Sequence, residues 1–128
     1  MIYLACPYTH EHVSVREYRV AVAAEVVVML WDAGLTVYSP LTHGDAMVQR
    51  VPEVEGRSHE WWMRHCLEFV RRSSEVYVLA LGGWDSSRGV LQELAEAERL
   101  GLPVRGVLWD DDGRSMTVCD RLGVPVKH

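Results

Sequence analysis

Residues 82–104, GGWDSSRGVLQELAEAERLGLPV, decide the fold that this sequence predicts. They follow an apolar run at residues 76–81 that is typical of a buried strand, and a glycine-rich turn leads into a helix with apolar residues at helical spacing. Gly101 and Pro103 end that helix, and a new apolar strand begins at Val104. Two strands joined through a helix lie parallel in one sheet, so the segment predicts an α/β fold.

The same alternation of strands and helices extends along the chain. Strands are expected at residues 2–6, 35–39, 76–81 and 104–109, and helices at about 12–33, from 58 to about 71, and after residue 87. Between residues 41 and 57 only a short helix at 45–50 is expected, and the rest reads as a loop or lid. The tail, with Met116, Val118, Leu122 and Val124, predicts a short edge strand.

These elements predict a single three-layer α/β domain over residues 1–128, with a mainly parallel sheet of four to five strands. In a flavodoxin-like or Rossmann-like sheet of order 2-1-3-4-5, strands one and three are neighbours where the winding reverses. A ligand crevice then opens between the loops that follow them, residues 7–12 and 82–89.

Composition narrows the class of protein. The chain has 128 residues, of which 48% are hydrophobic and 24% charged, as in an ordinary globular domain. Its net charge of -5 argues against polymeric nucleic acid as a partner, although a helix amino end can hold a single phosphate. Cys6, Cys66 and Cys119 form no close-spaced pair and are expected to be reduced thiols of a cytoplasmic protein. No basic leader and no apolar run of membrane length are visible, so no membrane partner is expected.

Glu93 is the leading candidate for catalysis. It follows Gly89 by four residues, so both lie on one side of the helix near its amino end and near the expected crevice. A carboxylate there can act as a nucleophile or general base, for example at the anomeric carbon of a sugar. The alternative is that Glu93 is simply a good helix former on a solvated face.

Each residue of the turn before Glu93 has both a ligand-binding and a purely structural interpretation. Ser86, Ser87 and Gly89 can present hydroxyls and amides to a phosphate, or a serine can simply cap the helix. Asp85 can pair with Glu93 so that the pKa values of the two carboxyls separate, or it can be an ordinary turn residue.

Other candidates come from the neighbouring loops. Tyr8 and Pro7 follow the first strand, where the Tyr8 phenol can bond to the carboxylate or to a sugar hydroxyl. Trp84 can stack on a base or cover the edge of the sheet. His43 is expected as a polar residue at the strand-two end of the crevice.

No metal site is expected, because the histidines and cysteines lack metal-ligand spacing. The adjacent tryptophans Trp61 and Trp62 predict a subunit interface or a lid contact, because a narrow core stripe does not take both.

Four motifs in order, IYLACPY, LTVYSPLTHG, EVYVLALGGW and SxGVxxELxxAxxxGxPV, resemble the nucleoside 2-deoxyribosyltransferase superfamily. They are most similar to small bacterial and phage relatives with a GWxxSxG…E signature. The resemblance implies a flavodoxin-like fold, a nucleophilic glutamate at Glu93 and an active-site tyrosine at Tyr8, with no cofactor. Ser87 stands where the transferases carry aspartate, and in related nucleoside-monophosphate N-glycosidases a serine there contacts the 5′-phosphate. A nucleotide substrate is therefore implied. Such relatives commonly complete their active sites across a subunit interface, so the resemblance also implies a homo-oligomer, a dimer or tetramer.

A second aspartate of the family, on the helix before strand three, has no clear counterpart here; His65, Cys66 and Glu68 occupy that neighbourhood. The leading hypothesis is an enzyme that cleaves the N-glycosidic bond of a nucleoside or its 5′-monophosphate, by hydrolysis or base exchange. The alternatives are a protein that binds or senses a nucleotide without turnover, and a structural domain whose tryptophan-rich surface serves assembly.

Overall fold

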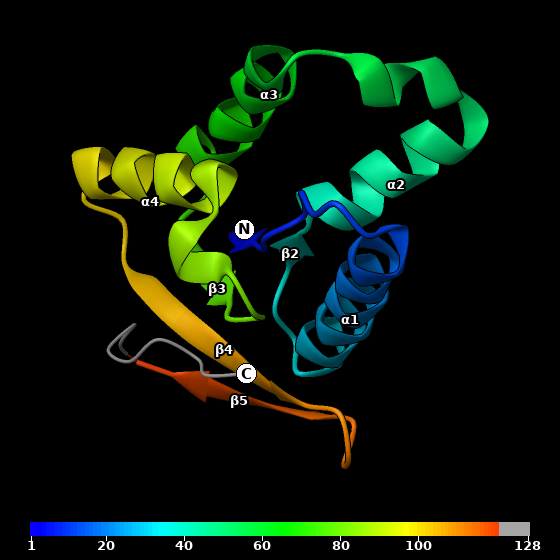
Figure 1. The fold of residues 1–128 in the computed structure, drawn as a ribbon. Helices are drawn as coiled ribbons and strands as arrows, with labels where there is room; N and C mark the ends of the chain where they lie inside the picture. Colours follow the sequence, from blue (N-terminus) through cyan, green and yellow to red (C-terminus); the bar gives the residue numbers. More distant parts are fainter. Residues whose placement is uncertain (121–128) are drawn as a thin grey trace.

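The computed structural model describes residues 1–120, which form a five-stranded sheet with helices on both faces (Figure 1). The strands are β1 (Ile2–Ala5), β2 (Val37–Tyr38), β3 (Glu75–Leu79), β4 (Val104–Asp110) and β5 (Ser115–Cys119). The helices are α1 (Val13–Asp32), α2 (Pro40–Arg50), α3 (His59–Arg71) and α4 (Arg88–Leu100). Two 3-10 turns, η1 (Pro52–Gly56) and η2 (Trp84–Ser86), precede α3 and α4.

The strand order is β2-β1-β3-β4-β5. Strands β1 to β4 pair in parallel, and β5 pairs antiparallel with β4. The predicted fold class and the predicted order are therefore confirmed. The expected edge strand is β5, which contains Met116 and Val118, whereas Leu122 and Val124 lie outside the described residues.

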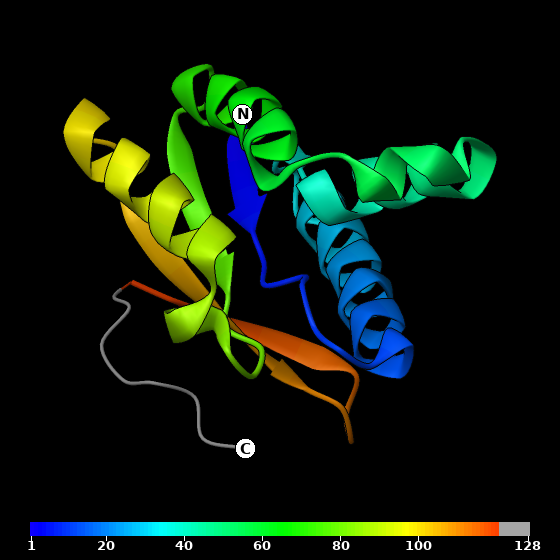
Figure 2. The same cartoon turned by 45° about the horizontal axis from the view of Figure 1, so that its top comes forward.

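The helices divide between the two faces of the sheet. One apolar cluster joins α1 to one face through Val22, Ala23, Val26 and Leu30. A second cluster joins α3 and α4 to the other face through Val70, Val90 and Ala97. Figures 1 and 2 show α1 apart from the α3–α4 pair in both views. The side chain at each position of β1 therefore reaches one of two separate cores, because neighbours in a strand point to opposite faces.

Helix α2 departs from the prediction, since it begins at Pro40 rather than near residue 45. Ser39 caps it, accepting a hydrogen bond from the Thr42 amide at 3.3 Å, and proline at the first helical position suits the backbone there. Gly44 does not break the helix. It lies against Trp62, whose ring would be 3.4 Å from a side-chain Cβ at that position.

Candidate functional site

Glu93 is buried at the interface between α4 and the sheet, with 4% of its surface exposed. It lies on the inner side of α4 with Val90 and Ala97, at helical spacing. The hydroxyl of Tyr3, a fully buried residue of β1, donates a hydrogen bond to Glu93 Oε2. The ordinary alternative for Glu93, a solvated helix position, is therefore wrong.

Burial raises the pKa of Glu93 from its ordinary value of 4.5 to about 8. The hydrogen bond from Tyr3 acts in the opposite direction, because a phenol that donates to a carboxylate stabilises the ionised form. The pKa of Tyr3 is raised as well, first by burial and then by the nearby Glu93 charge. At neutral pH the protonated form of Glu93 is therefore favoured.

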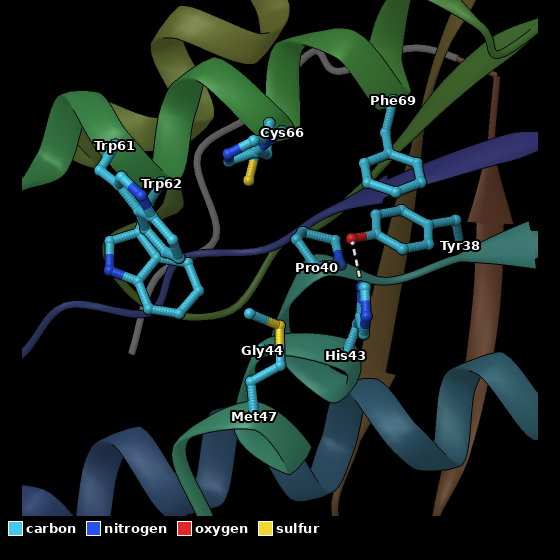
Figure 3. A pocket seen from close by; sticks show the side chains of 10 residues that line it. Tyr38, Pro40, His43, Gly44, Met47, Trp61, Trp62, Cys66 and Phe69 are labelled. Carbon is cyan, nitrogen blue, oxygen red and sulfur yellow. Dashed lines mark hydrogen bonds between the residues drawn. The ribbon is translucent and has the colours of Figure 1, made fainter. Parts of the chain in front are cut away.

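Cys66 connects this buried pair to a pocket. Its thiol lies beside Tyr3 and near Glu93, and burial raises its pKa to about 11. It also lines a pocket of about 340 Å³ between α2 and α3, which we call the α2–α3 pocket (Figure 3). The pocket is lined by Tyr38, Pro40, His43, Gly44, Met47, Trp61, Trp62, His65, Cys66 and Phe69. Cys66 is thus common to the pocket wall and to the surroundings of Glu93.

The walls of the α2–α3 pocket are aromatic. Tyr38 and Phe69 stack with ring centroids 3.9 Å apart and planes within 10°, and Trp61 meets Trp62 edge to face at 4.9 Å. The Tyr38 hydroxyl and His43 Nδ1 are 2.9 Å apart and share a hydrogen bond, drawn in Figure 3. Such a pocket offers flat apolar surfaces to a ring-shaped ligand and few free polar groups. His43 was predicted beside the end of strand two and does line this pocket.

Arg19 ties together the two loops between which a crevice is expected. This α1 residue is 7% exposed and donates to the carbonyls of Tyr8 at 3.3 Å and Thr9 at 3.1 Å, after β1. It also donates to the Gly82 carbonyl at 2.6 Å, after β3. The side chain of Arg19 therefore spans the point where the winding of the sheet reverses, and the α2–α3 pocket lies one strand away, at the end of β2.

Tyr8 does not bond to Glu93, whereas its contact with a sugar hydroxyl stays a prediction. Within residues 1–120, the phenol that bonds to Glu93 is that of Tyr3. Tyr8 is half-buried, and its pKa is raised by burial and then by Glu55, with Arg16 acting in the opposite direction. The two tyrosines differ because Tyr3 lies within β1 and faces α4, whereas Tyr8 lies in the loop beyond the strand.

The serines before α4 act in local structure. Ser87 caps the helix, accepting a hydrogen bond from the Val90 amide at 3.3 Å, and the Ser86 hydroxyl donates to the Gly83 carbonyl at 3.3 Å. A side-chain Cβ at Gly89 would lie 3.7 Å from the sulfur of Met63, in ordinary contact with α3. These residues do not line the α2–α3 pocket, and capping accounts for Ser87.

The remaining predicted site residues also lie away from the α2–α3 pocket. Asp85 is exposed, and burial rather than a second carboxylate is the main cause that raises the pKa of Glu93. Trp84 is 8% exposed and packs in the core beneath α4, where its indole N–H has no hydrogen-bond partner among residues 1–120. Pro7 is fully buried. A base therefore has no exposed face of Trp84 on which to stack.

Sequence reasoning overlooked Tyr3, Arg19 and the pocket between α2 and α3. A tyrosine in an otherwise apolar strand predicts a buried hydrogen bond, because its hydroxyl needs a partner once the ring is buried. Arg19 is another, since it shares the inward face of α1 with Val22, Ala23 and Val26. The pocket had no comparable signal, because its two walls come from helices whose relative position is set by tertiary packing.

The fold and site define a class: a three-layer α/β protein with a buried, phenol-bonded carboxylate beside an aromatic pocket. The chain belongs to the family described as "Domain of unknown function (DUF1937)", whose model matches residues 1–120. No protein of curated function matches the chain. Residues 1–120 contain no group of three metal-ligating side chains placed to hold an ion, and no helix in that range is long and apolar enough to cross a membrane.

Proposed function

We propose that this protein cleaves the N-glycosidic bond of a nucleoside or a nucleoside 5′-monophosphate, by hydrolysis or base exchange, with Glu93 as the nucleophile. The observation that carries the proposal is the buried Glu93 carboxyl, bonded to Tyr3 and adjacent to an aromatic pocket through Cys66. A carboxyl buried with one hydrogen bond costs stability when it ionises, and such groups are concentrated at functional sites. The motif resemblance to the nucleoside 2-deoxyribosyltransferase superfamily points to the same chemistry.

The α2–α3 pocket suits the base of such a substrate. Its volume of about 340 Å³ lies at the lower end of the range for small-molecule sites. Stacking against aromatic rings holds any base through its flat face, independently of the hydrogen bonds at its edge. No lysine or arginine is among the pocket-lining residues, so the pocket is matched to the base rather than to a phosphate.

In the reaction, an oxygen of ionised Glu93 bonds to C1′ as the bond from C1′ to the base nitrogen breaks. The base leaves with that electron pair and takes a proton from solvent. Water, or a second base, then attacks C1′ and releases Glu93. The Tyr3 hydroxyl holds one carboxylate oxygen and lowers the pKa of Glu93. Because the ionised form is the nucleophile, turnover is expected to rise with pH through about 8.

A second candidate, binding of a nucleotide without turnover, is favoured by a different observation. Glu93 is 4% exposed and is not among the pocket-lining residues, whereas Cys66 is. A base in the pocket would then meet Cys66 and the aromatic walls, and C1′ would reach Glu93 only after a local rearrangement. In this case ligand affinity does not depend on the ionisation of Glu93.

One experiment separates the two. The protein is incubated with ribo- and deoxyribonucleosides and their 5′-monophosphates, and free base is detected by chromatography. Glu93→Gln is the test variant, and Glu98→Gln, at an exposed position of the same helix, is the matched control. Base release by wild type and by Glu98→Gln, but not by Glu93→Gln, supports the enzyme.

No release from any substrate, together with equal quenching of tryptophan fluorescence by one nucleotide in wild type and Glu93→Gln, supports the binding protein. Base release that survives in Glu93→Gln overturns the assignment of the nucleophile.

A further inference from the structure

The outer face of α1 carries an apolar stripe. Ala21, Ala24, Val28 and Trp31 are all exposed, with 59% of Val28 and 61% of Trp31 accessible. They lie directly opposite the buried face of the helix, where a solvated helix would carry charged residues. Their spacing of three, four and three residues is the 3.5-residue repeat by which two helices pack along a common seam. We call these four residues the α1 stripe.

Trp31 is held in place although it is exposed. Its indole Nε1 donates to the Val37 carbonyl of β2 at 3.2 Å, which fixes the ring before any partner arrives. Leu35, 37% exposed, lies three residues after the end of the helix, beside Trp31, and extends the apolar surface. A rigid, exposed tryptophan loses little conformational freedom on binding, and such residues dominate the energetics of protein interfaces.

We propose that the α1 stripe is the contact by which a second copy of this chain packs antiparallel, about a two-fold axis. In that arrangement Trp31 lies against Ala21 of the partner subunit, and Val28 against Ala24 of the partner subunit. Both pairs are symmetric about residue 26, so a single register of the two helices forms both. In each pair a large side chain packs against an alanine. A parallel arrangement would instead place tryptophan against tryptophan and leave the alanines facing a gap.

The exposed area of the α1 stripe and Leu35 fits a weakly associating dimer. From the exposed fractions, the stripe and Leu35 present roughly 400 Å² per copy, so two copies bury roughly 800 Å². This area is below the roughly 1,200 Å² of standard specific interfaces, in the size range of weak, transient contacts. Glu17 and Asp32 flank the stripe as an exposed acidic rim. An interface of this area predicts weak self-association, with a dissociation constant of the dimer in the micromolar range.

Sedimentation velocity over a range of micromolar concentrations tests the proposal. Wild type is expected to show a monomer–dimer equilibrium. Val28→Glu and Ala24→Lys each place a charge in the seam and are expected to weaken association by roughly a hundredfold or more. Leu91→Glu is the matched control, because Leu91 is an exposed apolar residue, 48% accessible, on α4. Circular dichroism confirms that each variant is folded. A wild type that stays monomeric, or a Val28→Glu variant that dimerises normally, overturns the proposal.

The register is tested by combining the two substitutions in one chain. In the antiparallel arrangement each introduced lysine faces the introduced glutamate of the partner subunit, so the double variant is expected to dimerise more tightly than either single variant. In a parallel arrangement like charges face each other. A double variant that associates no better than the single variants overturns the antiparallel register.

Discussion

Arg19 and Glu93 are both buried ionisable side chains, and they lie on opposite faces of one sheet. Arg19, on α1, donates to three backbone carbonyls from two loops. Glu93, on α4, receives one hydrogen bond within residues 1–120, from Tyr3. Arg19 is therefore a charge used to hold the fold, whereas Glu93 is a carboxyl whose ionised form is poorly stabilised. A group of the second kind is the better functional candidate, because a ligand that supplies the missing stabilisation changes its protonation.

The largest loss of stability is expected when Arg19 is replaced and its three hydrogen bonds are lost. Arg19→Met keeps the length of the side chain but removes all three donors, and leaves the carbonyls of Tyr8, Thr9 and Gly82 without them. We expect the free energy of unfolding, measured with urea at neutral pH, to fall by about 3 kcal/mol.

Arg105→Met, at an exposed position of β4, is the control and is expected to change stability by less than about 1 kcal/mol. A loss for Arg19→Met no larger than that of the control would show that the tie between the loops contributes little.

The raised pKa of Glu93 is expected to make the free energy of unfolding depend on pH. Unfolded, Glu93 ionises near 4.5, and folded, near 8. Between these values the folded protein holds a proton that the unfolded chain has released, so stability is full below about 4.5, falls as pH rises and levels off above about 8. From pH 6 to pH 8 we expect Glu93 to account for a loss of about 2 kcal/mol.

Urea unfolding at several pH values measures this loss. Glu93→Gln, which has no proton to lose, is expected to remove the Glu93 contribution, whereas Glu98→Gln keeps it. Parallel curves for wild type and Glu93→Gln between pH 6 and pH 8 would contradict the raised pKa.

Much of the fold was predictable because it is carried by local patterns. The apolar runs and the glycine and serine positions around α4 predicted the strand–helix–strand unit, and parallel pairing followed from it. The start of α2 was not predicted, since only a short helix at residues 45–50 was expected in this region. In fact Ser39 followed by Pro40 is a favourable helix start, and Gly44 lies under Trp62.

The candidate site was predictable only in part. The sequence predicted the position of Glu93 on α4. It did not predict that Tyr3, rather than Tyr8, would be the hydrogen-bond partner of Glu93. Tyr3 lies within β1 and Tyr8 in the loop beyond it, and the sequence does not show which of the two rings faces α4. The α2–α3 pocket depends on how two helices meet, which no pattern within either helix specifies.

The smallest effect should come from removing the one hydrogen bond that Glu93 receives. Tyr3→Phe deletes the phenol hydroxyl and keeps the ring, so stability at low pH is expected to fall by only about 1 kcal/mol. Because the Tyr3 hydrogen bond lowers the pKa of Glu93, its loss should move that pKa further upward. A carbon-13 NMR titration of the Glu93 carboxyl measures the shift directly.

Tyr77→Phe is the matched control for this titration. Tyr77 is also a buried tyrosine of a central strand, 3% exposed, but it packs in the core on the α1 side, so the Glu93 titration should not move. A downward shift in Tyr3→Phe would mean that the phenol stabilises protonated Glu93 instead. Glu93 would then be a buried acid whose protonated form is held by a hydrogen bond, just as the Arg19 cation is held by its three.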